Sequence, residues 1–326
     1  MDIDLVKKIF TVQASNFEEV AIAVFQYQYQ HCNIYKQFVN AIHVNANSIS
    51  TISEIPFLPI SFFKTHQVVC GEFSADLIFK SSGTTSQNTA KHFIKNKNIY
   101  EASFNNGIAQ FYNNINNTCI LGLLPSYVEN GDSSLVFMVD YLIKNSTNKD
   151  SGIYLYDTPK LKSVLAKNTA NNIPTILIGV TYALLQFAQE HPLAFNDNII
   201  IMETGGMKGR GREMTRMEVH QILKEAFQIK NIHSEYGMTE LLSQAYSQLD
   251  GIFTCSNTMQ VFTRDFNDPL QTALIGKGAL NIIDLANVHS CSFIATQDVG
   301  EVYTNGSFLV NGRMDASDVR GCNMLV

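Results

Sequence analysis

The sequence predicts an α/β fold with mixed and largely parallel sheets flanked by helices. Two observations support this prediction. Short apolar runs alternate with helical segments between about residues 97 and 227, as in sheets whose strands are joined by helices. After about residue 250 the helical signal fades and the remaining short runs indicate strands. We therefore expect an α/β core with N-terminal helices over residues 1–250, and a β-rich subdomain with a C-terminal tail over residues 251–326.

The N-terminal third contains helices, a break and a strand. Residues 1 to about 50 are predicted to be helical, because apolar residues such as Val20, Val24 and Tyr27 recur at spacings compatible with one helical face. The prolines of segment 55–60 then force an extended conformation. The run at 76–79 is predicted to be a buried strand, and an amphipathic stretch follows at about 97–112.

The rest of the chain continues the alternation. We expect buried strands at 119–125, 175–179 and 199–203, and helices at about 133–142, 182–190 and 213–227. Further strands are expected at 252–254, 279–283 and 301–303.

Bulk composition excludes several classes of protein. The chain has 326 residues, 45% of them hydrophobic, and a net charge of −6 with acidic and basic residues interspersed, which argues against a nucleic-acid-binding surface. The start is acidic, unlike a signal peptide, and we expect no integral membrane segment. No two of the six cysteines are spaced Cys-x-x-Cys, so we expect reduced core cysteines in a cytoplasmic protein.

A segment rich in serine, threonine and glycine, Lys80-Ser81-Ser82-Gly83-Thr84-Thr85-Ser86, follows the predicted strand at 76–79. Gly83 lets the backbone approach an anion, and hydroxyl and N–H groups can then surround a phosphate. The Gly-Lys-Ser/Thr of a Walker A loop is absent. Such a cluster is also common in ordinary turns, so it does not identify a phosphate site by itself.

A second motif, Tyr236-Gly237-Met238-Thr239-Glu240, lies after a predicted strand at 231–234 and before an expected apolar helix. A threonine hydroxyl can donate to a phosphate, a carboxylate can hold Mg²⁺, and an aromatic ring can lie against a purine. The alternative is that Tyr236 is a core residue and Glu240 a first-turn helix carboxylate.

Three weaker features follow the same logic. Thr204-Gly205-Gly206 comes at the end of a predicted strand, where open α/β sheets bind ligands. Asp298 could hydrogen-bond a ribose diol, although an Asp before Gly is also an ordinary turn former. Arg313, in Gly312-Arg313-Met314-Asp315, could place a guanidinium near a phosphate, or lie in a surface loop.

Taken together and in this order, the motifs resemble those of the adenylate-forming superfamily, which comprises acyl-CoA synthetases, peptide-synthetase adenylation domains and luciferases. The resemblance implies the fold of the large N-terminal domain of these enzymes, with ATP and Mg²⁺ as cofactors. It implies that the phosphate loop consists of Ser81, Ser82, Gly83, Thr84 and Thr85.

The resemblance also implies roles for the later motifs. Gly205 and Gly206 would flank the adenine, with Tyr236 beside it. Thr239 would contact the phosphate, and Glu240 would bind Mg²⁺. Asp298 would hold the ribose hydroxyls, and Arg313 would lie near the ribose and phosphate.

Within that superfamily, most of the chain resembles the LuxE-type acyl-protein synthetases. The matching segments are Phe25-Gln26-Tyr27-Gln28-Tyr29, Pro56-Phe57-Leu58-Pro59-Ile60-Ser61-Phe62-Phe63-Lys64, Phe79 to Thr85, Leu124-Pro125-Ser126-Tyr127, Gly131 to Leu135, Thr204 to Gly209 and Arg320-Gly321-Cys322. The resemblance implies activation of a fatty acid as acyl-AMP, then acyl transfer to Cys322 before a reductase partner takes the group. A thiolate is a suitable nucleophile, and the nearby Arg320 would favour its ionisation.

Two departures leave alternatives open. The loop continues Ser86-Gln87-Asn88-Thr89-Ala90-Lys91 instead of the superfamily's Gly-x-Pro-Lys-Gly, and the sequence stops thirteen residues after Arg313, before any mobile lid domain with its catalytic lysine. We expect either a truncated chain or a branch without the lid. The alternatives are a phenylacetate-type acid–CoA ligase, with CoA or an acyl carrier protein as acceptor, and a catalytically degenerate adenylate-binding scaffold.

Overall fold

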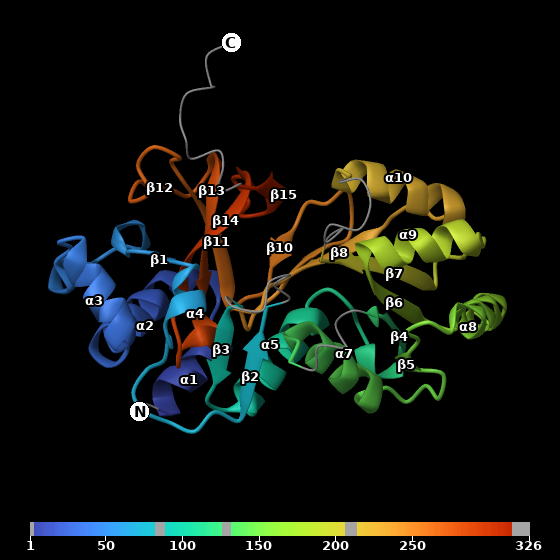
Figure 1. The fold of residues 1–326 in the computed structure, drawn as a ribbon, viewed down its shortest axis with the longest axis horizontal. Coiled ribbons are helices and arrows are strands. Elements are labelled where there is room, and N and C mark those ends of the chain that lie inside the picture. Colours follow the sequence, from blue (N-terminus) through green and yellow to red (C-terminus); the bar gives the residue numbers. More distant parts are fainter. Residues whose placement is uncertain (1–2, 82–88, 126–131, 206–213, 315–326) are drawn as a thin grey trace, which may run out of the picture.

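The computed structural model describes residues 3–81, 89–125, 132–205 and 214–314. In this part of the chain two large sheets stand side by side, a third sheet has two strands, and helices cover the large sheets (Figure 1). The α-helices are α1 (Ile3–Phe10), α2 (Phe17–His31), α3 (Asn33–Ala41), α4 (Phe62–Thr65), α5 (Lys97–Ala109), α7 (Ser134–Asn145), α8 (Thr158–Ala170), α9 (Thr181–Glu190) and α10 (Arg216–Phe227).

The larger sheet is mixed and has the order β10-β9-β8-β7-β6-β4-β5. Strands β5, β4, β6, β7 and β8 are parallel, and at the other edge β9 pairs antiparallel with both β8 and β10. Its strands are β4 (Cys119–Leu123), β5 (Gly152–Ile153), β6 (Thr175–Val180), β7 (Ile199–Thr204), β8 (His233–Tyr236), β9 (Ala245–Ser247) and β10 (Thr254–Cys255). The predicted α/β fold with mixed and parallel sheets is therefore confirmed.

Apolar runs form the central strands of this sheet because both of its faces are covered. Every residue of β4 and β6 is buried, which is typical of parallel strands between two layers of helices. Gly179, near the end of β6, is required by packing, because a Cβ at this position would lie 2.6 Å from the side chain of Leu184 on α9. The predicted strands at 119–125, 175–179 and 199–203 are confirmed.

The smaller sheet is formed mainly by the C-terminal part of the chain and is antiparallel apart from one edge strand. Its order is β1-β14-β13-β11-β12, with β15 also paired to β14 and β1 parallel to β14. The strands are β1 (Leu58–Pro59), β11 (Met259–Arg264), β12 (Thr272–Ala273), β13 (Gly276–Asp284), β14 (Phe293–Val302) and β15 (Phe308–Arg313). The β-rich C-terminal region is thus confirmed.

Helices α1 to α3 share a hydrophobic core with this smaller sheet. Phe25 of α2 and Tyr35 of α3 both pack against Phe293 of β14, with ring centroids 6.1 and 5.9 Å apart. A separate core lies around the larger sheet. The helical prediction for residues 1–50 is confirmed, and the domain division at residue 250 stays a prediction.

Outside the candidate site, one strand was predicted incorrectly and one helix was missed. The run at 76–79 is not a buried strand: β2 (Leu77–Lys80) pairs only with β3 (Lys91–Ile94) in an antiparallel hairpin, and of its residues only Phe79 is buried. Helix α8 was missed because it is weakly amphipathic. Its start does carry a signal, since the carboxylate of Asp157 accepts a hydrogen bond from the N–H of Lys160 and Pro159 lies in the first turn.

Candidate nucleotide and metal site

The motif Tyr236 to Glu240 follows strand β8 directly. The strand begins at His233, two residues later than predicted, and residues 237–244 form a loop, not the expected helix. The carboxylate of Asp284, at the end of β13, accepts hydrogen bonds from the N–H groups of Leu242 (2.6 Å) and Ser243 (3.0 Å). Because Asp284 of the smaller sheet accepts hydrogen bonds from these two N–H groups, they do not need the partners that a helix would provide.

Tyr236, Asp298 and Arg313 form one hydrogen-bonded group. The hydroxyl of Tyr236 donates to Asp298 Oδ2 at 2.7 Å, and Arg313 Nε donates to Asp298 Oδ1 at 3.0 Å. Asp298 does not lie in a turn and Arg313 does not lie in a surface loop, because they are opposite each other on the paired strands β14 and β15. The carboxylate is buried whereas the Arg313 side chain is 69% exposed. An anionic ligand can therefore reach the guanidinium.

The ring of Tyr236 belongs to an aromatic cluster. It packs against Phe253 and Phe308, with ring centroids 5.7 and 5.4 Å apart. Burial, and then the negative charge of Asp298, raise the pKa of the Tyr236 hydroxyl, so this group remains a hydrogen-bond donor at neutral pH. Its expected position beside the adenine stays a prediction.

Glu240 is a buried carboxylate near two cations. Burial raises the pKa of its carboxyl above the usual value. The positive charges of Arg313 and Lys64 oppose this rise without cancelling it. A bound divalent cation would stabilise the charged form of such a carboxylate, and Mg²⁺ is commonly held by one or two carboxylates plus substrate phosphates. Among the described residues no group of three or more His, Cys, Asp or Glu side chains could hold a metal ion. Glu240 therefore fits Mg²⁺ that takes its other ligands from phosphate and water.

The end of strand β7 meets the motif through a second buried carboxylate. The hydroxyl of Thr204 donates to Glu235 Oε2 at 2.5 Å. Burial raises the pKa of Glu235 to about 7; the hydrogen bond from Thr204 opposes this change and the nearby Glu203 adds to it. The backbone of Gly237 lies close to this carboxylate, because a Cβ at Gly237 would lie 2.5 Å from Glu235 Oε1 and the carboxylate would have to shift. Gly205, the residue after Thr204, has a φ of 69°, a conformation that favours glycine.

Ser81 closes the β2–β3 hairpin. Its N–H donates to the carbonyl oxygen of Ala90 at 3.0 Å, and its Oγ accepts from the N–H of Ala90 at 2.9 Å. The hydroxyl proton of Ser81 can still be donated to a ligand. Six predicted site residues lie outside the described residues. They are Ser82, Gly83, Thr84 and Thr85 of the predicted phosphate loop, Gly206 of the predicted adenine site and the predicted acyl acceptor Cys322.

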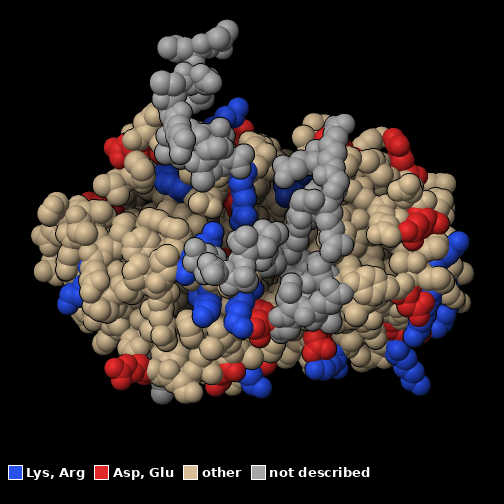
Figure 2. All heavy atoms as spheres, viewed as in Figure 1, with Lys and Arg blue, Asp and Glu red and all other residues tan. Residues whose placement is uncertain are grey.

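Positively charged side chains lie near the middle of one face of the molecule. Figure 2 shows several Lys and Arg side chains there, and others interspersed with acidic side chains along the margins of this face. Such a field attracts anions such as a nucleoside triphosphate even though the net charge of the chain is −6.

Two cavities differ greatly in size. A cavity of about 10 Å³, lined by His92, Leu242 and Asn287 among others, has room for about one water and cannot hold a substrate. A groove of about 590 Å³ lies between α9 and α10, and its walls include Tyr182, Leu185 and Ala226. The groove is large enough for an organic ligand.

Comparison with known proteins identifies the family. The chain matches the family described as "Acyl-protein synthetase, LuxE" over residues 10–326. The chain belongs to the LuxE acyl-protein synthetase family. No curated protein sequence matches it.

Solved structures share the fold. A long-chain-fatty-acid–CoA ligase, FadD1, from Archaeoglobus fulgidus has a TM-score of 0.53 and 14% identity, over 74% of this chain and 52% of that chain. A double mutant of o-succinylbenzoate CoA synthetase from Bacillus subtilis, bound with a product analogue, has a TM-score of 0.51 and 16% identity, over 74% and 50%. The chain thus spans about half the length of these enzymes, and identities this low show the fold alone.

The fold is the one expected from the sequence, that of the large N-terminal domain of adenylate-forming enzymes. Within the described residues, no helix is both long and apolar enough to span a membrane.

Sequence reasoning missed several residues that shape this site. Glu235 has a recognisable signal, since it is an acidic residue directly before Tyr236 in a strand that is otherwise mostly buried. His92, Asp284 and Asn287 have none: they hydrogen-bond to the main chain of Thr239, Leu242 and Glu240, respectively, from distant parts of the chain. Cysteines 32, 70, 119, 255 and 291 are free, as expected, and all but Cys255 are buried.

Proposed function

We propose that this protein activates a carboxylic acid with ATP to form an acyl-adenylate, and then transfers the acyl group to the thiol of its own Cys322. The observation that supports this most strongly is the convergence of Tyr236, Asp298, Arg313 and Glu240. These residues come from β8, the following loop, β14 and β15, and each is predicted separately to contact a nucleotide or its metal.

Each of these residues would make a different contact with the nucleotide or its metal. Asp298 would accept hydrogen bonds from the ribose hydroxyls, and the exposed guanidinium of Arg313 would lie against a phosphate. Thr239 would donate its hydroxyl to the same phosphate. Glu240 would hold Mg²⁺, which when bound neutralises the charge that develops on the phosphates.

The chemistry consists of two displacements. A carboxylate oxygen of the acid attacks the α-phosphorus of ATP, the bond to the β-phosphate oxygen breaks, and pyrophosphate leaves with that electron pair. The thiolate of Cys322, having lost its proton to solvent, then attacks the acyl carbon, and AMP leaves as a thioester forms. The protein contributes mainly positioning and charge stabilisation to the first step.

The groove between α9 and α10 is suited to the hydrocarbon chain of a fatty acid. The apolar part of its lining includes Leu185, Met214, Ile222 and Ala226, and Gln186 and Gln189 also line it. Burying a methylene contributes about 0.8 kcal/mol, so a long chain would gain substantial affinity from such a lining. A reductase subunit would be the expected recipient of the acyl group.

The deciding experiment has two measurements on the same protein. Acid-dependent ATP–pyrophosphate exchange, across acids from acetate to palmitate and simple aryl acids, reports the first step. Intact-mass and peptide analysis then locates a hydroxylamine-labile acyl group, which we expect on the peptide that contains Cys322. Cys322→Ser should abolish the label and leave the exchange largely unchanged, because adenylation precedes thiol transfer.

The outcomes separate the alternatives. A label that maps to another cysteine would contradict the role of Cys322. Exchange without any protein label would favour a ligase that delivers the acyl group to CoA or a carrier protein. No exchange with any acid would favour a catalytically inactive scaffold. Cys291→Ser is the matched control, since this cysteine is buried in the hydrophobic core beside the smaller sheet.

A further inference from the structure

His92 lies where the two central parts of the proposed site meet. It is on β3, the strand that leaves the Ser/Thr/Gly segment, and it is 1% exposed. Its Nδ1 lies 2.8 Å from the carbonyl oxygen of Thr239, which is 147 residues away in the sequence. A carbonyl oxygen can only accept, so Nδ1 carries the proton in this hydrogen bond. The imidazole therefore donates to the backbone of the motif residue that precedes Glu240.

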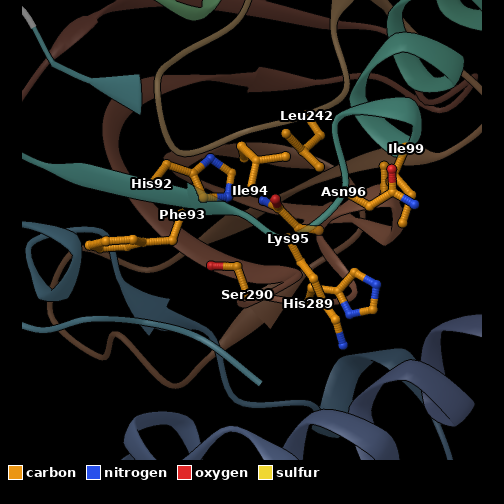
Figure 3. Close-up of a pocket in the computed structure, with 11 residues that line it drawn as sticks. His92, Phe93, Ile94, Lys95, Asn96, Ile99, Leu242, His289 and Ser290 are labelled. Atoms are coloured by element: carbon orange, nitrogen blue, oxygen red, sulfur yellow. The ribbon is translucent and has the colours of Figure 1, made fainter. Parts of the chain in front are cut away.

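The surroundings of His92 hold its ring in place. The ring of Phe63, on α4, packs edge-on against it with centroids 5.7 Å apart. Figure 3 shows His92 of β3 and Leu242, in the loop at residues 237–244, on the wall of the same small cavity. A cavity of about 10 Å³ leaves little room for the ring to move. The donor at Nδ1 is consequently presented in one orientation.

A second side chain holds the neighbouring peptide. Nδ2 of Asn287, in the turn after β13, donates to the carbonyl oxygen of Glu240 at 2.7 Å. The main chain of Asn287 is itself held, because its main-chain carbonyl oxygen accepts a hydrogen bond from Gln28 Nε2 at 2.9 Å. Two successive carbonyl groups of the motif, those of Thr239 and Glu240, are thus fixed by buried donors from different elements. These two peptides flank the Cα of Glu240, so holding both sets the direction of the Glu240 side chain, and the first of them also adjoins Thr239.

We propose that His92 is a positioning residue for adenylation: its Nδ1–H, donated to the carbonyl oxygen of Thr239, aims the Thr239 hydroxyl and the Glu240 carboxylate at the nucleotide and its metal. This inference rests on the proposed function. It assigns to His92 no contact with substrate and no proton transfer. Partners that orient metal ligands typically contribute about 10- to 100-fold in metal affinity or activity when they are removed.

The test compares three substitutions at this one position. Asn can place an amide N–H near the position of Nδ1, whereas the longer Gln cannot, and Ala removes the donor. The probe is Mn²⁺ titrated by electron paramagnetic resonance in the presence of α,β-methylene-ATP. We expect His92→Ala and His92→Gln to weaken Mn²⁺ binding by about 10- to 100-fold, and His92→Asn to retain most of it.

Turnover provides a second measurement. In pyrophosphate exchange, His92→Ala should lower kcat by a similar factor and leave the KM for the carboxylic acid nearly unchanged, because the acid does not contact this loop carbonyl. The matched control is His233→Ala, which removes another packed histidine that is hydrogen-bonded to the Tyr112 hydroxyl instead of the motif. This control should retain the Mn²⁺ affinity.

Several results would overturn the inference. They are an unchanged Mn²⁺ affinity in His92→Ala, equal losses in His92→Asn and His92→Gln, or an equal loss in His233→Ala. If His92→Ala does not fold, the Asn and Gln variants decide alone. Failure of the proposed function is distinguishable, because wild-type protein would then bind Mn²⁺ and nucleotide yet exchange no pyrophosphate with any acid.

Discussion

Glu240 is the residue whose chemistry is most sensitive to a single change. Glu240→Gln keeps the size of the side chain but removes the charge that would bind Mg²⁺. We expect pyrophosphate exchange to fall by about 100-fold or more, because a metal ligand contributes several kcal/mol and each 1.36 kcal/mol corresponds to tenfold in rate. The Mg²⁺ concentration for half-maximal exchange should rise as well.

The control for Glu240→Gln is Glu301→Gln, on the same strand as Asp298 but paired only with Lys277 at the surface. It should exchange pyrophosphate like the wild type. Wild-type rates and an unchanged Mg²⁺ dependence in Glu240→Gln would show that the metal assignment is wrong.

Glu235 makes the stability of the protein depend on pH in a predictable direction. Burial raises its pKa to about 7, above the roughly 4.3 of an unfolded chain. The folded state therefore binds the proton more tightly. The contribution of the neutral carboxyl is fully present below about pH 4 and is lost as the pH rises through about 7. Glu235→Gln mimics the neutral form at every pH.

Urea unfolding of both proteins at pH 5 and pH 8 measures this effect. Relative to the wild type, Glu235→Gln should gain up to roughly 3 kcal/mol in the free energy of unfolding between the two pH values. Glu72→Gln, which changes an exposed carboxylate in the loop before β2, should show no such gain. A difference between Glu235→Gln and wild type that is the same at pH 5 and pH 8 would contradict the assignment.

At the scale of elements, the groove between α9 and α10 makes a prediction about chain length. Ala226→Phe would fill part of the groove from α10. Exchange with palmitate should fall while exchange with a short acid is retained, because each methylene that is no longer buried forfeits about 0.8 kcal/mol. Met217→Phe is the control, since Met217 lies on the same helix but is 81% exposed. Equal losses for long and short acids would place the acyl chain elsewhere.

At the scale of the whole molecule, Arg216 joins the two sheets. Its Nε donates to the buried carboxylate of Glu203 at the end of β7 at 2.9 Å, and its Nη1 donates to the carbonyl oxygen of Val310 on β15 at 3.3 Å. Its guanidinium also lies 4.8 Å from the ring centroid of Phe253. The nucleotide contacts come from both sides of this junction, so its integrity determines whether they remain together.

Arg216→Met should destabilise the protein by about 3 kcal/mol in urea unfolding, because it removes the guanidinium that pairs with the buried Glu203 charge. Burial alone would raise the pKa of Glu203, but His220 and Arg216 outweigh it and the pKa is lowered. The double variant Arg216→Met/Glu203→Gln should lose less than Arg216→Met alone, since no buried charge then remains. A double variant that is less stable than the single one would refute this explanation.

The sequence by itself determined the elements whose burial pattern is local. Strands β4, β6 and β7 are continuous apolar runs, and α9 and α10 follow amphipathic patterns, so neighbouring residues are sufficient to predict them. The order of the motifs also indicated an adenylate-forming protein. The sequence failed where a segment's environment depends on distant residues, as for β2, which pairs with β3 and not with either large sheet in the described residues, and for the loop after Tyr236.

Only the tertiary structure decided how the site is held together. The Tyr236–Asp298 hydrogen bond spans 62 residues, and the His92–Thr239 hydrogen bond spans 147. Asp298 meets Arg313 because of the register of β14 and β15, and Glu235 meets Thr204 because β7 and β8 are adjacent in the sheet. Strand order and register depend on how two separate cores pack, which no single stretch of sequence encodes.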